Sequence, residues 1–168
     1  SMRADQYVIQ RTDSGVSVDI VYDPNGTYLQ TLTNVERLQF NDKTIALDVT
    51  PEGNTGKAMG FLGTVAPTLM NDTSIRGLII SLFDQGQTME SLSQLALDQH
   101  LLPTNSNLEL ANAVYHNVLG GAASTEMTNA LVGFIEAHGQ AKFLATVAGL
   151  HINVDLVGLQ QTGVEYLI

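Results

Sequence analysis

The chain has 168 residues and a mass of 18.0 kDa, enough for one ordinary hydrophobic core or two small ones. An apolar content of 44% with 14% charged residues is typical of a folded chain, and the absence of cysteine excludes disulfides and zinc–thiolate sites. The net charge of −10 disfavours nucleic acid, which needs clustered Lys and Arg, and no apolar run reaches the roughly 20 residues of a membrane span.

Residues 7–49 have the pattern of an antiparallel β-meander of about five short strands. Apolar and polar residues alternate over 16–22, which is the period of a half-buried strand. Asp-Pro-Asn-Gly at 23–26 then supplies a turn, because Pro fixes φ and Asn-Gly tolerates a positive φ. Further strands are predicted at 28–33, 35–40 and 44–49. A sheet of this size is marginal alone, so we expect one of its faces to pack on another part of the chain.

The sequence Pro-Glu-Gly-Asn at 51–54 marks a change from strand to helical periodicity. Six helices are predicted between this point and residue 150. Their predicted N-caps include Thr88, Asn107 and Ser124, and their predicted C-caps include Gly120 and Gly139. The chain is therefore predicted to be an α+β protein. It has a β segment at 1–50, a helical domain at 51–150, and a tail at 151–168 that either adds a strand to the sheet or caps the helices.

The six predicted helices read as two copies of a three-helix unit. A shift of 53 positions places residues 56–97 on residues 109–150 without a gap. The same shift aligns the helical patterns and places Gly86 on Gly139, where each glycine interrupts two helices. A duplicated helical unit is therefore predicted.

Two segments match patterns found in known proteins. The first reads LTNVERLQF at 32–40, followed by Asp42 and by Ala-Leu-Asp at 46–48. The second reads ANAVYHNVLG at 111–120, followed by LVGF at 131–134. These segments resemble a strand motif and a helical domain of unknown function in bacterial RTX-type and surface-layer-like exoproteins, where the motif commonly follows calcium-binding repeats.

The resemblance implies that the chain lies near the C-terminal end of a larger protein that is secreted or displayed on the bacterial cell surface. It also implies export by a type I secretion apparatus, an ABC-transporter system that reads an uncleaved C-terminal signal, and the base-poor tail at 151–168 fits such a signal. The family usually has an Arg-x-Pro-Asp-like loop and a Tyr-Trp pair, whereas this chain has Gly-Ala-Ala-Ser at 121–124 and no Trp. We expect a structural and export domain; the alternative is a glycan- or protein-binding module of an adhesin or surface layer.

Calcium is the one cofactor candidate. Four residues on predicted turns carry oxygen atoms of the kind that this hard cation prefers: Asp23, Asn25, Asp42 and Asp48. Asp and Asn are also the residues that turns favour for their own backbone hydrogen bonds. The chain has neither the glycine-rich nonapeptide of a β-roll nor the spacing of an EF-hand loop.

No arrangement of residues predicts a catalytic site. The histidines at 100, 116, 138 and 151 lack the i, i+4 spacing of a helical zinc site. Glu90 and Glu126 lie in predicted first turns, where a carboxylate stabilises the helix dipole. The glycine-rich stretch at 53–63 lacks the Lys-Ser/Thr that holds phosphate and magnesium. We therefore expect that the chain is not an enzyme.

Overall fold

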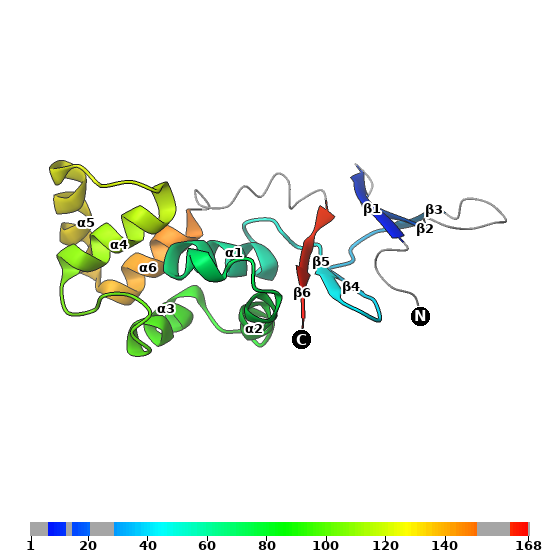
Figure 1. Cartoon of the computed structure of the whole chain (residues 1–168), viewed down its shortest axis with the longest axis horizontal. Helices are drawn as coiled ribbons and strands as arrows, with labels where there is room; N and C mark the ends of the chain where they lie inside the picture. The colour runs from blue at the N-terminus through cyan, green and yellow to red at the C-terminus, as the bar shows by residue number, and fades with distance from the viewer. Residues whose placement is uncertain (1–6, 13–14, 21–28, 151–161, 168) are drawn as a thin grey trace.

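A computed structural model describes residues 7–12, 15–20, 29–150 and 162–167, and it confirms the predicted α+β class. The strands in this part are β1 (Tyr7–Thr12), β2 (Gly15–Ile20), β3 (Leu29–Leu32), β4 (Arg37–Gln39), β5 (Thr44–Ala46) and β6 (Val164–Tyr166). The helices are α1 (Asn54–Val65), α2 (Thr73–Asp84), α3 (Met89–Asp98), α4 (Asn107–Leu119), α5 (Thr125–His138) and α6 (Gln140–Gly149). A short 3₁₀ helix, η2 (Pro67–Leu69), follows α1. The helices occupy one end of the molecule and the strands the other (Figure 1).

The described strands form two antiparallel sheets, with the orders β1-β2-β3 and β4-β5-β6. This corrects the prediction of one continuous meander, because β3 and β4 lie in different sheets. The physical reason lies between them, where Asn34 has a φ of 56° and turns the chain out of the extended conformation. The third strand of the second sheet is β6, which pairs with β5, so the described end of the tail adds a strand. We call β4–β5–β6 the junction sheet.

The junction sheet packs on both of its faces. Ala46 lies opposite Val164, and both join the buried core of the helices. On the other face, Ile45 packs with Leu38 and with Ile9 of β1 in a smaller cluster. The sheet therefore lies between the helices and the N-terminal sheet, as Figure 1 shows. This arrangement satisfies the expectation that so small a sheet needs a partner for its apolar faces.

Helix α1 forms the centre of the helical part. It packs against α2, α3, α4 and α6, and ten of its twelve residues are buried. Its glycines permit this close packing: a Cβ at Gly56 would lie 2.0 Å from the carbonyl oxygen of Thr50. The glycine-rich stretch therefore serves close backbone approach at the start of α1.

The two three-helix segments correspond in position but not in packing. Helices α1 and α4 begin 53 residues apart, at Asn54 and Asn107. Gly86 and Gly139, also 53 positions apart, both have left-handed backbones, with φ of 88° and 87°. However, α6 packs extensively against α1, whereas the corresponding pair, α3 and α4, has little contact. The duplication, like the division into three regions, stays a prediction.

The helix termini follow the predicted chemistry with one exception. The Thr88 and Ser124 side chains cap α3 and α5, and Gly120 and Gly139 end α4 and α5. Helix α4 is capped by Ser106 rather than by Asn107, because Asn107 is already helical and the Ser106 hydroxyl accepts from the Glu109 N–H. Within the described ranges, no helix has the length and apolar character needed to cross a membrane.

Candidate functional site

A charged network joins the junction sheet to the helices. Arg37 of β4 forms an ion pair with Asp48, the residue that ends the 32–48 motif. Its guanidinium also donates two hydrogen bonds, of 2.9 and 3.1 Å, to the two carboxylate oxygens of Asp84 at the end of α2. Asn54 at the start of α1 donates a further hydrogen bond of 2.9 Å to Asp84. One arginine thus connects β4, the loop after β5, and α2.

Asp48 also caps α1. Its carboxylate accepts hydrogen bonds from the hydroxyl and, at 3.3 Å, from the backbone N–H of Thr55. Its backbone oxygen accepts from the N–H of Gly56 at 3.3 Å. The position before the helix, Gly53, has no side chain that could accept these bonds. A carboxylate placed here also stabilises the positive end of the helix dipole.

Burial and charge shift two pKa values in this network. Burial lowers the pKa of Arg37, but the carboxylates of Asp48 and Asp84 outweigh it and raise that pKa above its ordinary value. Nearby, burial raises the pKa of the Tyr166 hydroxyl, and the positive charge of Arg37 acts in the opposite direction. The Nε atom of Arg37 is buried, and no acceptor contacts it in the described part of the chain. The network is therefore a set of paired charges at a partly buried boundary between sheet and helices, with Asp48 mostly buried and Asp84 exposed.

The calcium candidates are not assembled into one group by the described residues. Asp48 contacts Arg37 and Thr55, and Asp42 lies exposed in the turn between β4 and β5. Asp23 and Asn25 lie outside the described residues. Within the described ranges, no cluster of three or more His, Asp or Glu side chains could hold a metal ion. Calcium binding by these four residues stays a prediction.

The other titratable candidates lie apart from one another. Glu90 forms an exposed ion pair of 3.5 Å with Lys142. His138 stacks on Phe134 at a ring distance of 4.4 Å, and His116 lies in the last turn of α4. His100 and Glu126 are also exposed. His151 lies outside the described residues. The absence of a catalytic role stays an expectation.

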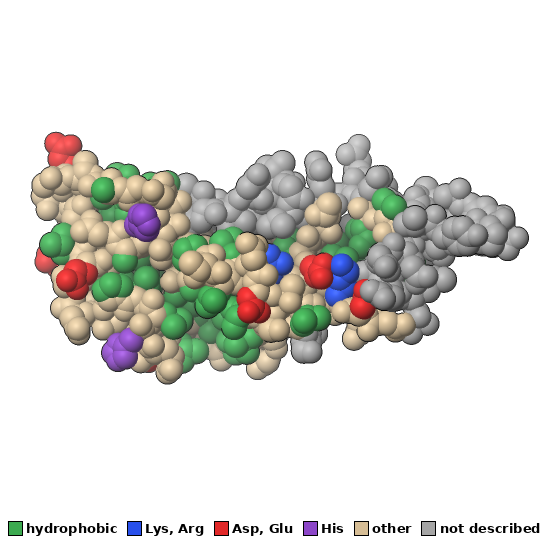
Figure 2. Space-filling view, in the orientation of Figure 1, with side chains coloured by type: hydrophobic (Ala, Val, Ile, Leu, Met, Phe, Trp, Pro, Cys, Tyr) green, Lys and Arg blue, Asp and Glu red, His purple; other side chains and the backbone are tan. Residues whose placement is uncertain are grey.

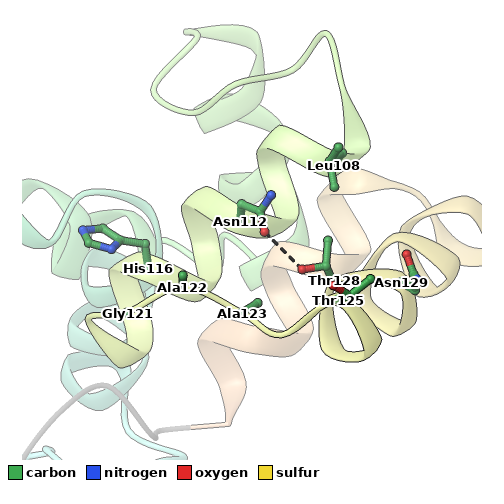
Figure 3. A pocket seen from close by; sticks show the side chains of 9 residues that line it. All are labelled: Leu108, Asn112, His116, Gly121, Ala122, Ala123, Thr125, Thr128 and Asn129. Atoms are coloured by element: carbon green, nitrogen blue, oxygen red, sulfur yellow. Dashed lines mark hydrogen bonds between the residues drawn. The ribbon is translucent and has the colours of Figure 1, made fainter.

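A pocket of about 550 Å³ opens between α4 and α5 (Figure 3). Helix α4 contributes residues at four-residue spacing, and α5 contributes residues at three- and four-residue spacing, so each helix presents one face. The loop between the helices closes one end with small residues. The lining residues are Leu108, Asn112 and His116 from α4, Gly121, Ala122 and Ala123 from the loop, and Thr125, Thr128 and Asn129 from α5.

The described pocket lining combines polar and apolar residues, and it contains no Asp, Glu, Lys or Arg. The hydroxyl of Thr128 donates a hydrogen bond of 3.2 Å to the Oδ1 atom of Asn112, drawn as the dashed line in Figure 3. Thr128 is only 8% exposed, so this bond fixes the orientation of an otherwise exposed amide. This bond uses the Oδ1 acceptor, so the Nδ2 group of Asn112, a residue of the pocket lining, stays available as a donor. In Figure 3 the ring of His116 points away from the pair.

The surface charge distinguishes the two ends of the molecule. On the face shown in Figure 2, the described basic side chains lie around the junction sheet, and the helical end carries acidic and His side chains. Arg37 of β4 and Lys43, in the turn before β5, pair with Asp48 and Glu165, respectively. At the helical end Lys142 of α6 is paired with Glu90, and the described lining of the pocket offers a strongly anionic ligand no Lys or Arg.

The sequence patterns did not point to the residues that organise the charged network and the α4–α5 pocket. Arg37 was present in the motif but was treated as part of a strand pattern; its rarity, as one of seven bases, was the available signal. Asn112 and Thr128 were hidden in helical patterns read only for their apolar residues. A search for polar residues at helical spacing on both sides of the loop at 120–124 would have found them.

No family model, curated protein or solved structure matches this chain. The resemblance to the helical domain of RTX-type exoproteins therefore stays an expectation. A functional conclusion rests on the fold, the junction sheet and the pocket.

Proposed function

We propose that the chain is a structural and export domain of a secreted or cell-surface bacterial protein, in which the helices close the end of an upstream β region. One observation carries this proposal: β6 pairs with β5 and is covered on its outer side by α2. The Leu167 N–H donates a hydrogen bond of 3.0 Å to the Thr73 carbonyl at the start of α2. A covered edge stops further strand addition, which is what the end of a β region requires.

The composition supports an extracellular location. Seventeen acidic residues against seven basic ones suit a protein that stays soluble in a cation-rich medium, and a chain without cysteine folds independently of redox conditions. The resemblance of the 32–48 motif points to the same class of exoprotein. The export signal of this proposal is residues 151–168, which would be read by a type I secretion apparatus.

A secretion assay tests the export proposal. The full chain is fused to the C-terminal end of a passenger enzyme and expressed together with a type I exporter. We expect passenger activity in the medium, and we expect its loss when residues 151–168 are deleted. Retention of the full-length fusion inside the cell would overturn the proposal.

A matched variant separates the signal from the fold. Ala46 is fully buried and lies opposite Val164, so Ala46→Asp breaks the pairing of β5 with β6 while leaving residues 151–168 unchanged. If the tail sequence is the signal, this variant is still exported. If Ala46→Asp is retained like the deletion, export depends on the junction sheet and the assignment of the signal to the tail is wrong.

The alternative function is a glycan- or protein-binding module. The observation that favours it is the uncharged pocket between α4 and α5, which has no role in holding the junction sheet. A binding role and an export role are compatible, since the pocket and the tail are separate parts of the chain.

A further inference from the structure

The α4–α5 pocket has the size of a small-molecule site. Its volume of about 550 Å³ lies within the roughly 300–1,000 Å³ that such sites span. In the described part of the chain, it is formed by α4, α5 and the loop between them. Helices that pack together usually bury apolar residues along their contact, whereas Asn112 of α4 and Thr128 of α5 meet here through a hydrogen bond.

The polar groups of the pocket suit hydroxyl groups. The Asn112 amide is held by Thr128 and presents a donor, while the amide of Asn129 can both donate and accept. The hydroxyl of Thr125 can also both donate and accept a hydrogen bond. A sugar hydroxyl has one O–H donor and two acceptor lone pairs, so sugar hydroxyls satisfy such a mixed set without any net charge.

The remaining lining is small and apolar. Leu108 is 51% exposed at the pocket mouth, and Ala122 and Ala123 line the loop side. These groups match the C–H surface of a sugar ring, which an ion or a strongly polar ligand does not offer. Among the described lining residues there is no Phe, Tyr or Trp, and the ring of His116 points away from the Asn112–Thr128 pair, so we expect no stacking and a low affinity.

The surrounding charge selects against anionic ligands. Glu109 and Glu126 lie in the first turns of the two helices that form the pocket, next to the lining residues Leu108 and Thr125. The nearest charges along both elements are therefore negative. The described lining contains no Lys or Arg, and the ring of its His116 points away from the Asn112–Thr128 pair (Figure 3), so a uronic acid or a phosphate would find no ion-pair partner there.

We infer that the α4–α5 pocket binds one residue of a neutral saccharide, with the Asn112 amide as the principal hydrogen-bond donor. This inference rests on the alternative function, a binding module, and gives it a site and a ligand class. It is independent of the export signal, because a sugar titration needs no exporter.

An NMR titration of the full chain tests the site. The probes are methyl α-glucoside, methyl α-galactoside and N-acetylglucosamine, with glucuronate as the anionic control. We expect at least one neutral probe to shift the amide signals of Asn112, Ala122 and Thr128 with a Kd of about 1 mM. Glucuronate should produce no saturable shift. The inference is overturned if no neutral probe shifts these signals, or if glucuronate binds equally well.

Two substitutions then separate the site from binding elsewhere. Asn112→Ala removes the donor on an exposed helix face and should weaken binding about five- to tenfold. Thr128→Val keeps the shape but releases the Asn112 amide, so it should weaken binding by a smaller factor. The matched control is Asn105→Ala, an exposed asparagine outside the pocket, with unchanged affinity. Unchanged binding by Asn112→Ala would show that the saccharide site lies elsewhere, while the binding function itself would stand.

Folding of these variants is checked independently. Asn112 is exposed within α4, where alanine is a better helix former than asparagine, so Asn112→Ala should unfold at the wild-type temperature or slightly above it. An unchanged amide spectrum outside the pocket would show that lost binding reflects the missing donor. A globally altered spectrum with lost binding would instead make Asn112 a structural residue and overturn its role as the donor.

Discussion

The two three-helix segments, α1–α3 and α4–α6, have similar helix lengths but different surroundings. Helix α1 buries ten of its twelve residues, whereas α4 buries three of thirteen. The first segment meets the junction sheet through α2, and the second forms the pocket at the far end. Similar helical patterns therefore serve two purposes, because position in the fold decides which faces are covered.

The difference also shows in the glycines. A Cβ at Gly77 of α2 would lie 1.7 Å from the carbonyl oxygen of Leu167, the residue after β6. At Gly133 of α5, a Cβ would meet nothing within 4 Å. The first glycine is required by a close contact between backbones, and the second lies in open space.

The largest expected effect comes from substituting these glycines. Gly77→Ala should destabilise the protein by about 2–3 kcal/mol, because Leu167 and β6 must move away from α2. Gly133→Ala should stabilise it by about 0.5–1 kcal/mol through helix propensity. Urea denaturation of both variants measures the two values. Equal effects of the two substitutions would contradict the close docking of β6 on α2.

The second effect concerns the charged network. Arg37→Ala leaves Asp48 and Asp84 without their cation, and Asp48 is only 12% exposed, so a loss of about 2 kcal/mol is expected. The comparison is Lys142→Ala, which removes the exposed ion pair with Glu90 and should cost less than about 0.5 kcal/mol. Thermal unfolding monitored by circular dichroism distinguishes the two. A loss for Arg37→Ala no greater than that for Lys142→Ala would mean that the network does not hold the sheet.

The smallest effect is a pH dependence at Tyr166. Burial raises the pKa of its hydroxyl above the ordinary value of 10.0. Above about pH 10 the unfolded state therefore loses its proton before the folded state, and the free energy of unfolding falls as pH rises towards the folded pKa. Tyr166→Phe removes this contribution, so its stability should fall less steeply. Urea denaturation at about pH 8 and about pH 10.5 measures the change in the free energy of unfolding with pH. An equal change for the wild type and for Tyr166→Phe would contradict the prediction.

The local features of the fold were predictable from short-range chemistry. The change from strand to helix at 51–54 is followed by α1 at Asn54, and the predicted caps at Thr88 and Gly120 are present. These features depend on neighbouring residues. The pairing of β5 with β6 joins residues about 120 positions apart, and no local pattern specifies which distant strand completes a sheet.

Burial was predicted less well than helical structure. Leu78 and Met127 are apolar residues at positions where the helical period predicts the packed side of α2 and α5, yet they are 55% and 45% exposed. Ile80, in contrast, is fully buried because it lies on the face of α2 that packs against α1. A stripe gives a helix an apolar side, but neighbouring elements decide how wide a sector of that side is covered.

The candidate site was less predictable than the fold. Asp48 was identified as an oxygen ligand, and its residue type fits calcium as well as it fits the cap of α1. Its partner, Arg37, could be assigned only from the structure, since the two approach across β4 and β5. The Asn112–Thr128 bond likewise needs the packing of α4 on α5 before it can be recognised.

Hydrogen exchange of the full chain tests the contrast between the two segments most directly. Amides of α1, β5 and β6 should exchange only through global unfolding, because they lie between other elements. Amides of α5, which buries only Thr128 and Ile135, should exchange through local opening at a clearly lower free energy. Protection of α5 equal to that of α1 and β5 would contradict the account of one segment that holds the sheet and another that leaves a face free for binding.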